Sequence, residues 1–204
     1  MYLGGRCNLC LSIRMGDYMR LIDILSGKRE IIEKKWFDMV AASYPVNASS
    51  FLKNQKNQFA NPVGNTIEEA VHAVIDVLIH EGTDEKAYTC LDRLVKVRAV
   101  QDFAPSRAVD FLFMLKQLLK DELKNEFHTG DVYDEFLLIE SRIDSMALFS
   151  FESYLKYKEK IYELKVSEFK NMAFRLLERA NLTFEFKDEG PAFEKGVAER
   201  DTVK

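Results

Sequence analysis

The chain has 204 residues, of which 47% are hydrophobic and 30% charged. This is the composition of a globular protein with one core, and not of a disordered chain. A net charge of −4 argues against a nucleic-acid-binding protein, because phosphate recognition depends on concentrated lysine and arginine. The sequence predicts no membrane-spanning helix, since it lacks a run of about 18 uncharged apolar residues. Three cysteines make no disulfide framework, which indicates a reducing, cytoplasmic environment.

The N-terminal residues differ from the rest in showing little periodicity. We interpret residues 1–17 as a leader, either disordered or an upstream extension of the reading frame. It precedes a helical domain over 18–181 and a polar, disordered tail over 182–204. Cys7 and Cys10 have the spacing of a redox pair or of half a zinc site. A complete zinc site needs a second ligand pair, so we favour two thiols without a role.

Helical periodicity begins near Tyr18 and is expected to break at Ser26–Gly27. A second helix, from about Ile31, is expected to end at Tyr44, because Pro45 disfavours helix in the residue before it. A short segment with two phenylalanines follows and ends at the next turn signal.

That turn signal is Asn61-Pro62-Val63-Gly64. The asparagine and proline start a turn in which Gly64 is expected to adopt a positive φ. Thr66 and Glu69 then form the pattern of a capping box. The sequence therefore predicts a corner at Asn61–Gly64 and a helix over 67–80.

A second corner separates two further helices. Apolar residues at helical spacing precede it, namely Leu91, Leu94, Val95, Val97 and Val100. Pro105 forbids a straight continuation and suits the first turn of a new helix, and it pushes Ala104 towards an extended conformation. In the new helix the residues from Val109 to Leu119 are apolar over most of the circumference, which predicts the central helix of the domain.

Polar residues crowd this second corner, and they include Arg98, Gln101, Asp102 and Arg107. Side chains of this kind satisfy carbonyls that end one helix and amides that start the next, and this structural role is preferred. The same exposed corner is also a candidate docking surface.

After a break at Thr129–Asp131, residues 132–180 contain neither proline nor glycine. Phe136, Tyr154 and Met172 are spaced by 18, which is five helical turns, whereas a strict heptad would slip off this face. We expect one very long helix, or two nearly collinear ones, packed on the domain and not a free coiled coil. Its length indicates that part of it meets a second subunit.

Two groups of residues are candidates for chemistry. Glu68, His72, Asp76 and His80 follow one helix stripe and would hold a metal if a second helix added ligands, although a solvated face is preferred. The aromatic side chains Trp36, Phe51, Phe59, Phe103, Phe111 and Phe113 would line a ligand pocket, although core packing is the default. A catalytic triad order, a glycine-rich phosphate loop and the HExxH motif are missing from the sequence.

Several blocks of sequence resemble, in order and spacing, the N-terminal domain of the RsbRD-type RsbT co-antagonists. The blocks are Trp36-Phe37-Asp38, Ser43-Tyr44-Pro45, Phe51-Leu52-Lys53, Phe59-Ala60-Asn61-Pro62-Val63-Gly64, Val97-Arg98-Ala99-Val100-Gln101-Asp102-Phe103-Ala104-Pro105-Ser106, Arg142-Ile143-Asp144, Tyr162-Glu163 and Leu176-Leu177-Glu178-Arg179-Ala180-Asn181. The resemblance covers roughly residues 22–181.

The resemblance implies a bacterial, cytoplasmic sensory or regulatory module with a non-haem, globin-like helical fold that forms dimers. In that family a C-terminal STAS domain builds the stressosome core and sequesters a partner kinase. Here only a polar tail follows Asn181, so the chain resembles a stand-alone input module. Ala104 stands where the family usually has a capping serine or threonine, which should weaken that helix start by about 1 kcal/mol.

The leading hypothesis is therefore an all-α, globin-like bundle with a very long C-terminal helix, acting as a non-enzymatic regulatory homodimer. A ligand or an unidentified regulatory protein would bias two helix packings at the corners, formed by Asn61, Pro62, Gly64, Arg98, Gln101, Asp102, Phe103, Pro105 and Ser106. No catalytic residue, cofactor, metal, nucleic-acid partner or membrane insertion is predicted. The alternative is a small-molecule or cofactor site in the aromatic core, and metal-dependent catalysis at the Glu68–His80 stripe ranks last.

Overall fold

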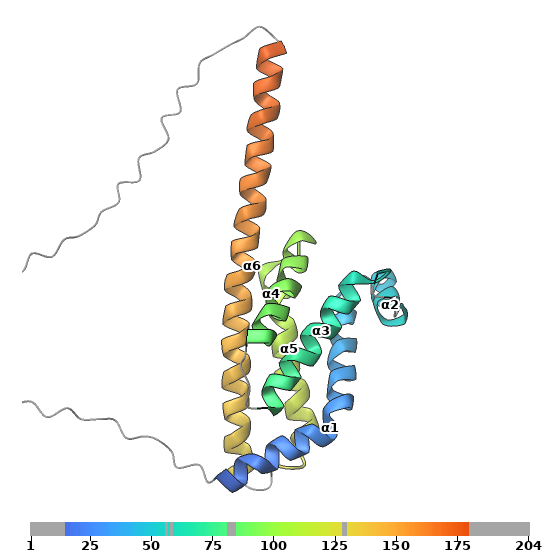
Figure 1. The fold of residues 1–204 in the computed structure, drawn as a ribbon, viewed down its shortest axis with the longest axis vertical. Coiled ribbons are helices and arrows are strands. Elements are labelled where there is room, and N and C mark those ends of the chain that lie inside the picture. The colour runs from blue at the N-terminus through green and yellow to red at the C-terminus, as the bar shows by residue number, and fades with distance from the viewer. Residues whose placement is uncertain (1–14, 56, 58, 81–84, 128–129, 180–204) are drawn as a thin grey trace, which may run out of the picture. The chain divides into compact units, whose positions relative to one another are not determined.

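The computed structural model describes residues 15–55, 57, 59–80, 85–127 and 130–179. All regular structure in these ranges is helical, which confirms the all-α prediction. The helices are α1 (Met15–Ala42), α2 (Val46–Asn54), α3 (Pro62–Ile79), α4 (Glu85–Val100), α5 (Pro105–Leu123) and α6 (Gly130–Arg179) (Figure 1). None of them is both long enough and apolar enough to cross a membrane.

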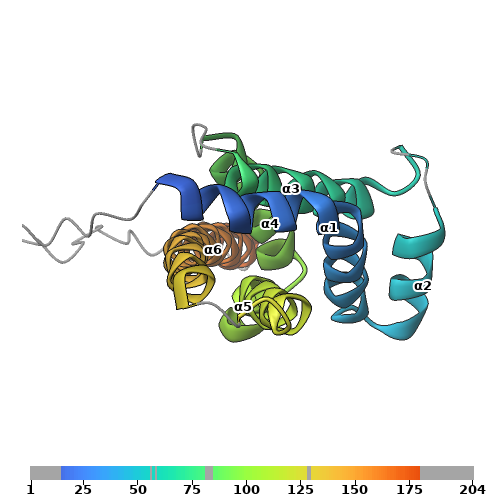
Figure 2. The same ribbon diagram turned by 90° about the horizontal axis from the view of Figure 1, so that it is seen from below.

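The chain divides into two compact units, residues 1–162 and 163–204. In the first unit α3 packs against α1, α2 and α4, and α1 also packs against α5 (Figure 2). Ten of the 18 residues of α3 are buried, against eight of 19 in α5. The most surrounded helix is therefore α3 and not the predicted helix after Pro105, whose Phe113 is exposed.

The first helix is longer than predicted. It begins at Met15, inside the predicted leader, and runs unbroken through Ser26 and Gly27 to Ala42, so the expected break is wrong. Both figures show a bend in α1 instead (Figures 1 and 2), and serine–glycine pairs are common places for such bends. Burial of Leu25 and Ile32, on either side of this pair, outweighs the weak helix propensity of the two residues.

Gly27→Ala is expected to stabilise the protein by about 0.5–1 kcal/mol, because alanine loses less backbone entropy than glycine in a helix. The substitution brings no clash, since a Cβ atom at Gly27 would have nothing within 4 Å. Urea denaturation followed by circular dichroism measures the change. A loss of stability would instead show that the bend of α1 requires a glycine.

The fourth helix buries Leu91, Leu94 and Val95 as predicted, whereas Val100 is exposed. The last helix confirms the predicted very long helix, with 50 residues. Phe136 and Tyr154 are buried as predicted, whereas Met172, the next residue of that series, is 60% exposed. The side chains of residues 163–179 are exposed or half-buried. Residues 1–14 and 180–204, with most of the predicted leader and all of the predicted tail, lie outside the described part.

Candidate functional site

The corner between α4 and α5 is closed by its own backbone. The amide of Phe103 donates to the carbonyl of Arg98 at 3.1 Å, and the amide of Asp102 donates to the carbonyl of Ala99 at 3.3 Å. This is the Schellman pattern of a helix C-terminus. Asp102 supplies the left-handed conformation that the pattern needs, with a φ of 60°. The prediction that polar side chains cap the end of α4 is therefore wrong: the backbone does so.

The start of α5 follows the sequence prediction. Ala104 is extended, with φ of −65° and ψ of 149°, and makes no side-chain capping bond, and Pro105 opens the helix. Gln101, Asp102, Pro105 and Ser106 are exposed. These residues form the outer surface of the corner, whereas Phe103 is half-buried and packs against the core.

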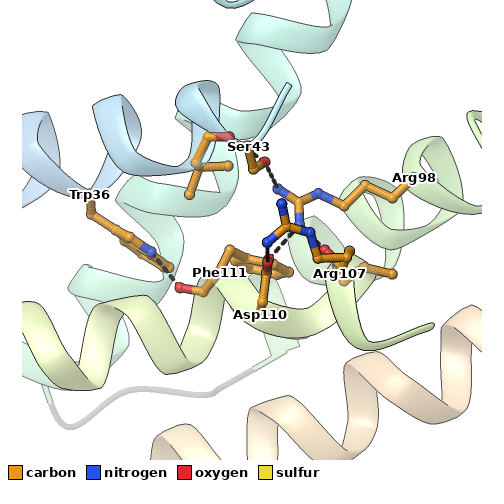
Figure 3. A network of polar contacts seen from close by, with 8 residues as sticks. Trp36, Ser43, Arg98, Arg107, Asp110 and Phe111 are labelled. Carbon is orange, nitrogen blue, oxygen red and sulfur yellow. Dashed lines mark hydrogen bonds and ion pairs between the residues drawn. The ribbon is translucent and has the colours of Figure 1, made fainter. Parts of the chain in front are cut away.

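Arg98 has the opposite environment, since its side chain is fully buried. Its Nη1 atom donates to the carbonyls of Arg107 at 2.9 Å and Ala108 at 3.3 Å, and it lies 3.4 Å from Oδ1 of Asp110. Its Nη2 atom donates to Oγ of Ser43 at 3.3 Å (Figure 3). Arg98 therefore ties the end of α1 to the first turns of α5, which is a structural role and not an exposed recognition role.

Aromatic rings surround the buried guanidinium. Its carbon lies 4.8 Å from the ring centroid of Phe111, 5.2 Å from that of Phe103 and 5.7 Å from that of Tyr44. Burial raises the pKa of Tyr44, and the nearby positive charge of Arg98 opposes that rise. Trp36 packs on the other side of Phe111 and donates from Nε1 to its carbonyl at 2.7 Å (Figure 3).

Helix α6 holds the outer part of the same corner. The hydroxyl of Tyr154 donates to the carbonyl of Phe103, and Nζ of Lys158 pairs with Oδ1 of Asp102. The hydrogen bond with Asp102 raises the pKa of Lys158, against the lowering effect of burial. Between these two residues on the helix, Tyr157 donates to Oδ2 of Asp92 in α4 at 2.5 Å. That hydrogen bond, with burial and the carboxylate charge, raises the pKa of Tyr157 to about 12. These contacts were not visible in the sequence.

The second predicted corner is built around the side chain of Asn61, which is buried. Its Oδ1 atom accepts the amide of Gly64 at 2.9 Å, so it is the N-cap of α3. Its Nδ2 atom donates to the carbonyls of Leu52 at 3.0 Å and Gln55 at 2.9 Å. One amide side chain thus joins the end of α2 to the start of α3. Each corner is held by its own set of contacts.

Two details of this corner differ from prediction. The helix begins at Pro62 and not near residue 67, so Thr66 lies inside it and its hydroxyl donates to the carbonyl of Pro62. The predicted capping box is therefore wrong. Gly64 does not have a positive φ. A glycine stands there for another reason, because a Cβ atom would lie 2.1 Å from Nδ2 of Asn61.

The two middle residues of the Glu68–His80 stripe, His72 and Asp76, face α1. His72 lies 3.0 Å from Glu33 and 3.9 Å from Glu68, and Asp76 lies 2.6 Å from Arg29. Within the described residues, no group of three or more potential ligand side chains is arranged to hold a metal. The described cysteine, Cys90, is buried with a free thiol, whereas Cys7 and Cys10 lie outside the described residues.

The aromatic residues proposed to line a pocket are not gathered around one. Phe59 is 95% exposed and Phe51 is about half exposed, whereas Trp36 and Phe111 pack together in the core. An interior cavity of about 10 Å³ is lined by aliphatic side chains, among them Leu78. A wider cleft of about 730 Å³ lies between α3 and α4 and is lined mainly by polar residues. The geometry gives no support to a cofactor site among these rings.

The family model described as the RsbT co-antagonist protein rsbRD N-terminal domain matches residues 31–167 of this chain. The matched region includes both corners and extends from α1 into α6. Comparisons with curated proteins and with solved structures gave no match.

Proposed function

Because the chain belongs to the RsbRD N-terminal domain family, we propose that it is a non-enzymatic regulatory domain. It acts as the sensory input of a bacterial, cytoplasmic stressosome-type system through contacts between proteins, and it has a globin-like, non-haem fold. The match over residues 31–167 carries this proposal. The polar side chains of Asn61 and Arg98 support the non-enzymatic part of this proposal. Their hydrogen bonds are made to helix ends and to neighbouring helices, which is a structural role.

The proposed functional unit is a homodimer formed through α6. Apolar residues recur along this helix at heptad positions, with steps of seven and then of alternating four and three. They are Leu148, Leu155, Tyr162, Val166, Phe169, Ala173 and Leu176. All of them except Ala173 are large side chains that are exposed, with exposed fractions of 42–72%. A second copy of the same helix is the partner that matches this spacing, because coiled-coil pairs repeat every 3.5 residues. We name these seven residues the α6 seam.

This seam lies on a different face from the one that the sequence analysis followed. Phe136 and Tyr154, spaced by 18, are buried on the domain, whereas Leu148 follows Phe136 by 12 residues, which places it about 120° around the helix. One helix therefore has one apolar face for its own core and a second, exposed one. The second subunit was predicted from the length of the helix and from the family resemblance, and the seam gives that proposal named residues.

Phe169→Glu is expected to convert the dimer to a monomer. Two like charges would face each other in the seam, so the dissociation constant should rise by at least about 100-fold. Size-exclusion chromatography with light scattering measures the mass in solution. Asn171→Glu is the matched control, because it adds the same charge two residues away at an exposed position outside the seam. A wild-type chain that stays monomeric at high concentration would contradict the dimer.

A further inference from the structure

One buried ammonium group contacts both the α4–α5 corner and the α6 seam. Nζ of Lys158 pairs with Asp102, and the Lys158 side chain is only 11% exposed while that of Asp102 is 80% exposed. The same Nζ atom lies 5.4 Å from the ring centroid of Tyr162, a seam residue. A nearly buried charge is therefore neutralised by a carboxylate at the solvent edge, and it also rests on a ring of the proposed interface.

The backbone of the corner is also held by α6. Asp102 has the left-handed conformation, which residues other than glycine adopt at some energetic cost. The next residue, Phe103, accepts a hydrogen bond from the hydroxyl of Tyr154 through its carbonyl. Tyr154, Lys158 and Tyr162 follow one another at four-residue steps, so each side chain neighbours the next along the helix. Movement of the corner and movement of these side chains are thus mechanically linked.

We propose that Asp102, Lys158 and Tyr162 form a relay through which occupation of the α4–α5 corner sets the strength of the α6 dimer. The inference rests on the proposed function. A cationic group of a partner protein that pairs with the exposed carboxylate of Asp102 would compete with Lys158 for this counter-charge. An unpaired ammonium is unfavourable in a buried position, so Lys158 would turn outward along α6. There the Lys158 side chain of each subunit would place a positive charge beside the seam. Repulsion between the two charges would weaken the dimer.

Asp102→Asn imitates the occupied corner, because it removes the carboxylate charge and keeps a residue that tolerates the left-handed conformation. The dimer dissociation constant, measured by analytical ultracentrifugation, should rise about fivefold or more. Asp102→Gly removes the same charge with a residue that favours this backbone conformation, and it should give the same weakening. The double variant Asp102→Asn/Lys158→Met removes the unpaired ammonium as well, and it should return to within about twofold of wild type.

The outcomes separate the relay from the proposed function. If Asp102→Asn dimerises as tightly as wild type while Phe169→Glu is monomeric, the dimer stands and the relay is wrong. If Asp102→Asn weakens the dimer but Asp102→Gly does not, the effect comes from the backbone, and the relay is again wrong. A wild-type chain that is monomeric at every concentration overturns both proposals.

Discussion

Arg98→Ala is expected to lower the free energy of unfolding by about 3–5 kcal/mol, because it removes a fully buried side chain and leaves several hydrogen-bond acceptors without their donor. The substitution removes four polar contacts at once, to the carbonyls of Arg107 and Ala108, to Asp110 and to Ser43. It also leaves a void beside the ring of Phe111. Such a loss is a large fraction of the stability of a domain.

Fluorescence during urea denaturation measures this effect well, because Trp36 is the single tryptophan of the chain and packs on Phe111. Arg107→Ala is the matched control. Arg107 pairs with the same carboxylate, that of Asp110, but its side chain is 63% exposed. Exposed ion pairs contribute less than about 1 kcal/mol. Equal losses in the two variants would contradict the structural role assigned to Arg98.

Gly64→Ala is the second substitution with a large expected effect, a loss of about 2–4 kcal/mol. The new Cβ atom would lie 2.1 Å from Nδ2 and 2.7 Å from Oδ1 of Asn61. The side chain of Asn61 cannot simply move away, because three hydrogen bonds hold it. Its displacement removes the N-cap of α3 and leaves the carbonyl of Leu52 without its side-chain partner.

Two comparisons make this result specific. Gly27→Ala is the same substitution in another helix, where a Cβ atom meets nothing within 4 Å, so its effect should have the opposite sign. Asn61→Ala should destabilise wild type but add little to Gly64→Ala, because both remove the same hydrogen bonds. Thermal and urea denaturation measure both comparisons. If Gly64→Ala were as stable as wild type, this result would contradict the clash that the structure gives between the new Cβ atom and Asn61.

Part of the candidate site could be read from sequence patterns. Pro105 placed the start of α5, and Asn61 and Pro62 marked the other corner, because the covalent geometry of proline acts wherever it stands. A further signal lies in the position of Arg98 along its helix. Arg98 follows Leu91 by seven residues and Val95 by three, so it lies in the buried stripe of α4, whereas Val100 lies outside it. The position in the stripe indicated burial more reliably than the residue type did.

The helical period, the proline positions and the uninterrupted stretch after residue 130 determined by themselves that this protein is all-α with a very long last helix, since these signals depend on neighbours within a few residues. Tertiary structure alone decided the rest. The hydrogen bond between Trp36 and Phe111 joins residues 75 apart, and that between Arg98 and Ser43 joins residues 55 apart. The space that excludes a side chain at Gly64 likewise depends on where Asn61 points. Such contacts depend on how helices pack, and helical periodicity gives the buried face of a helix without giving the partner that covers it.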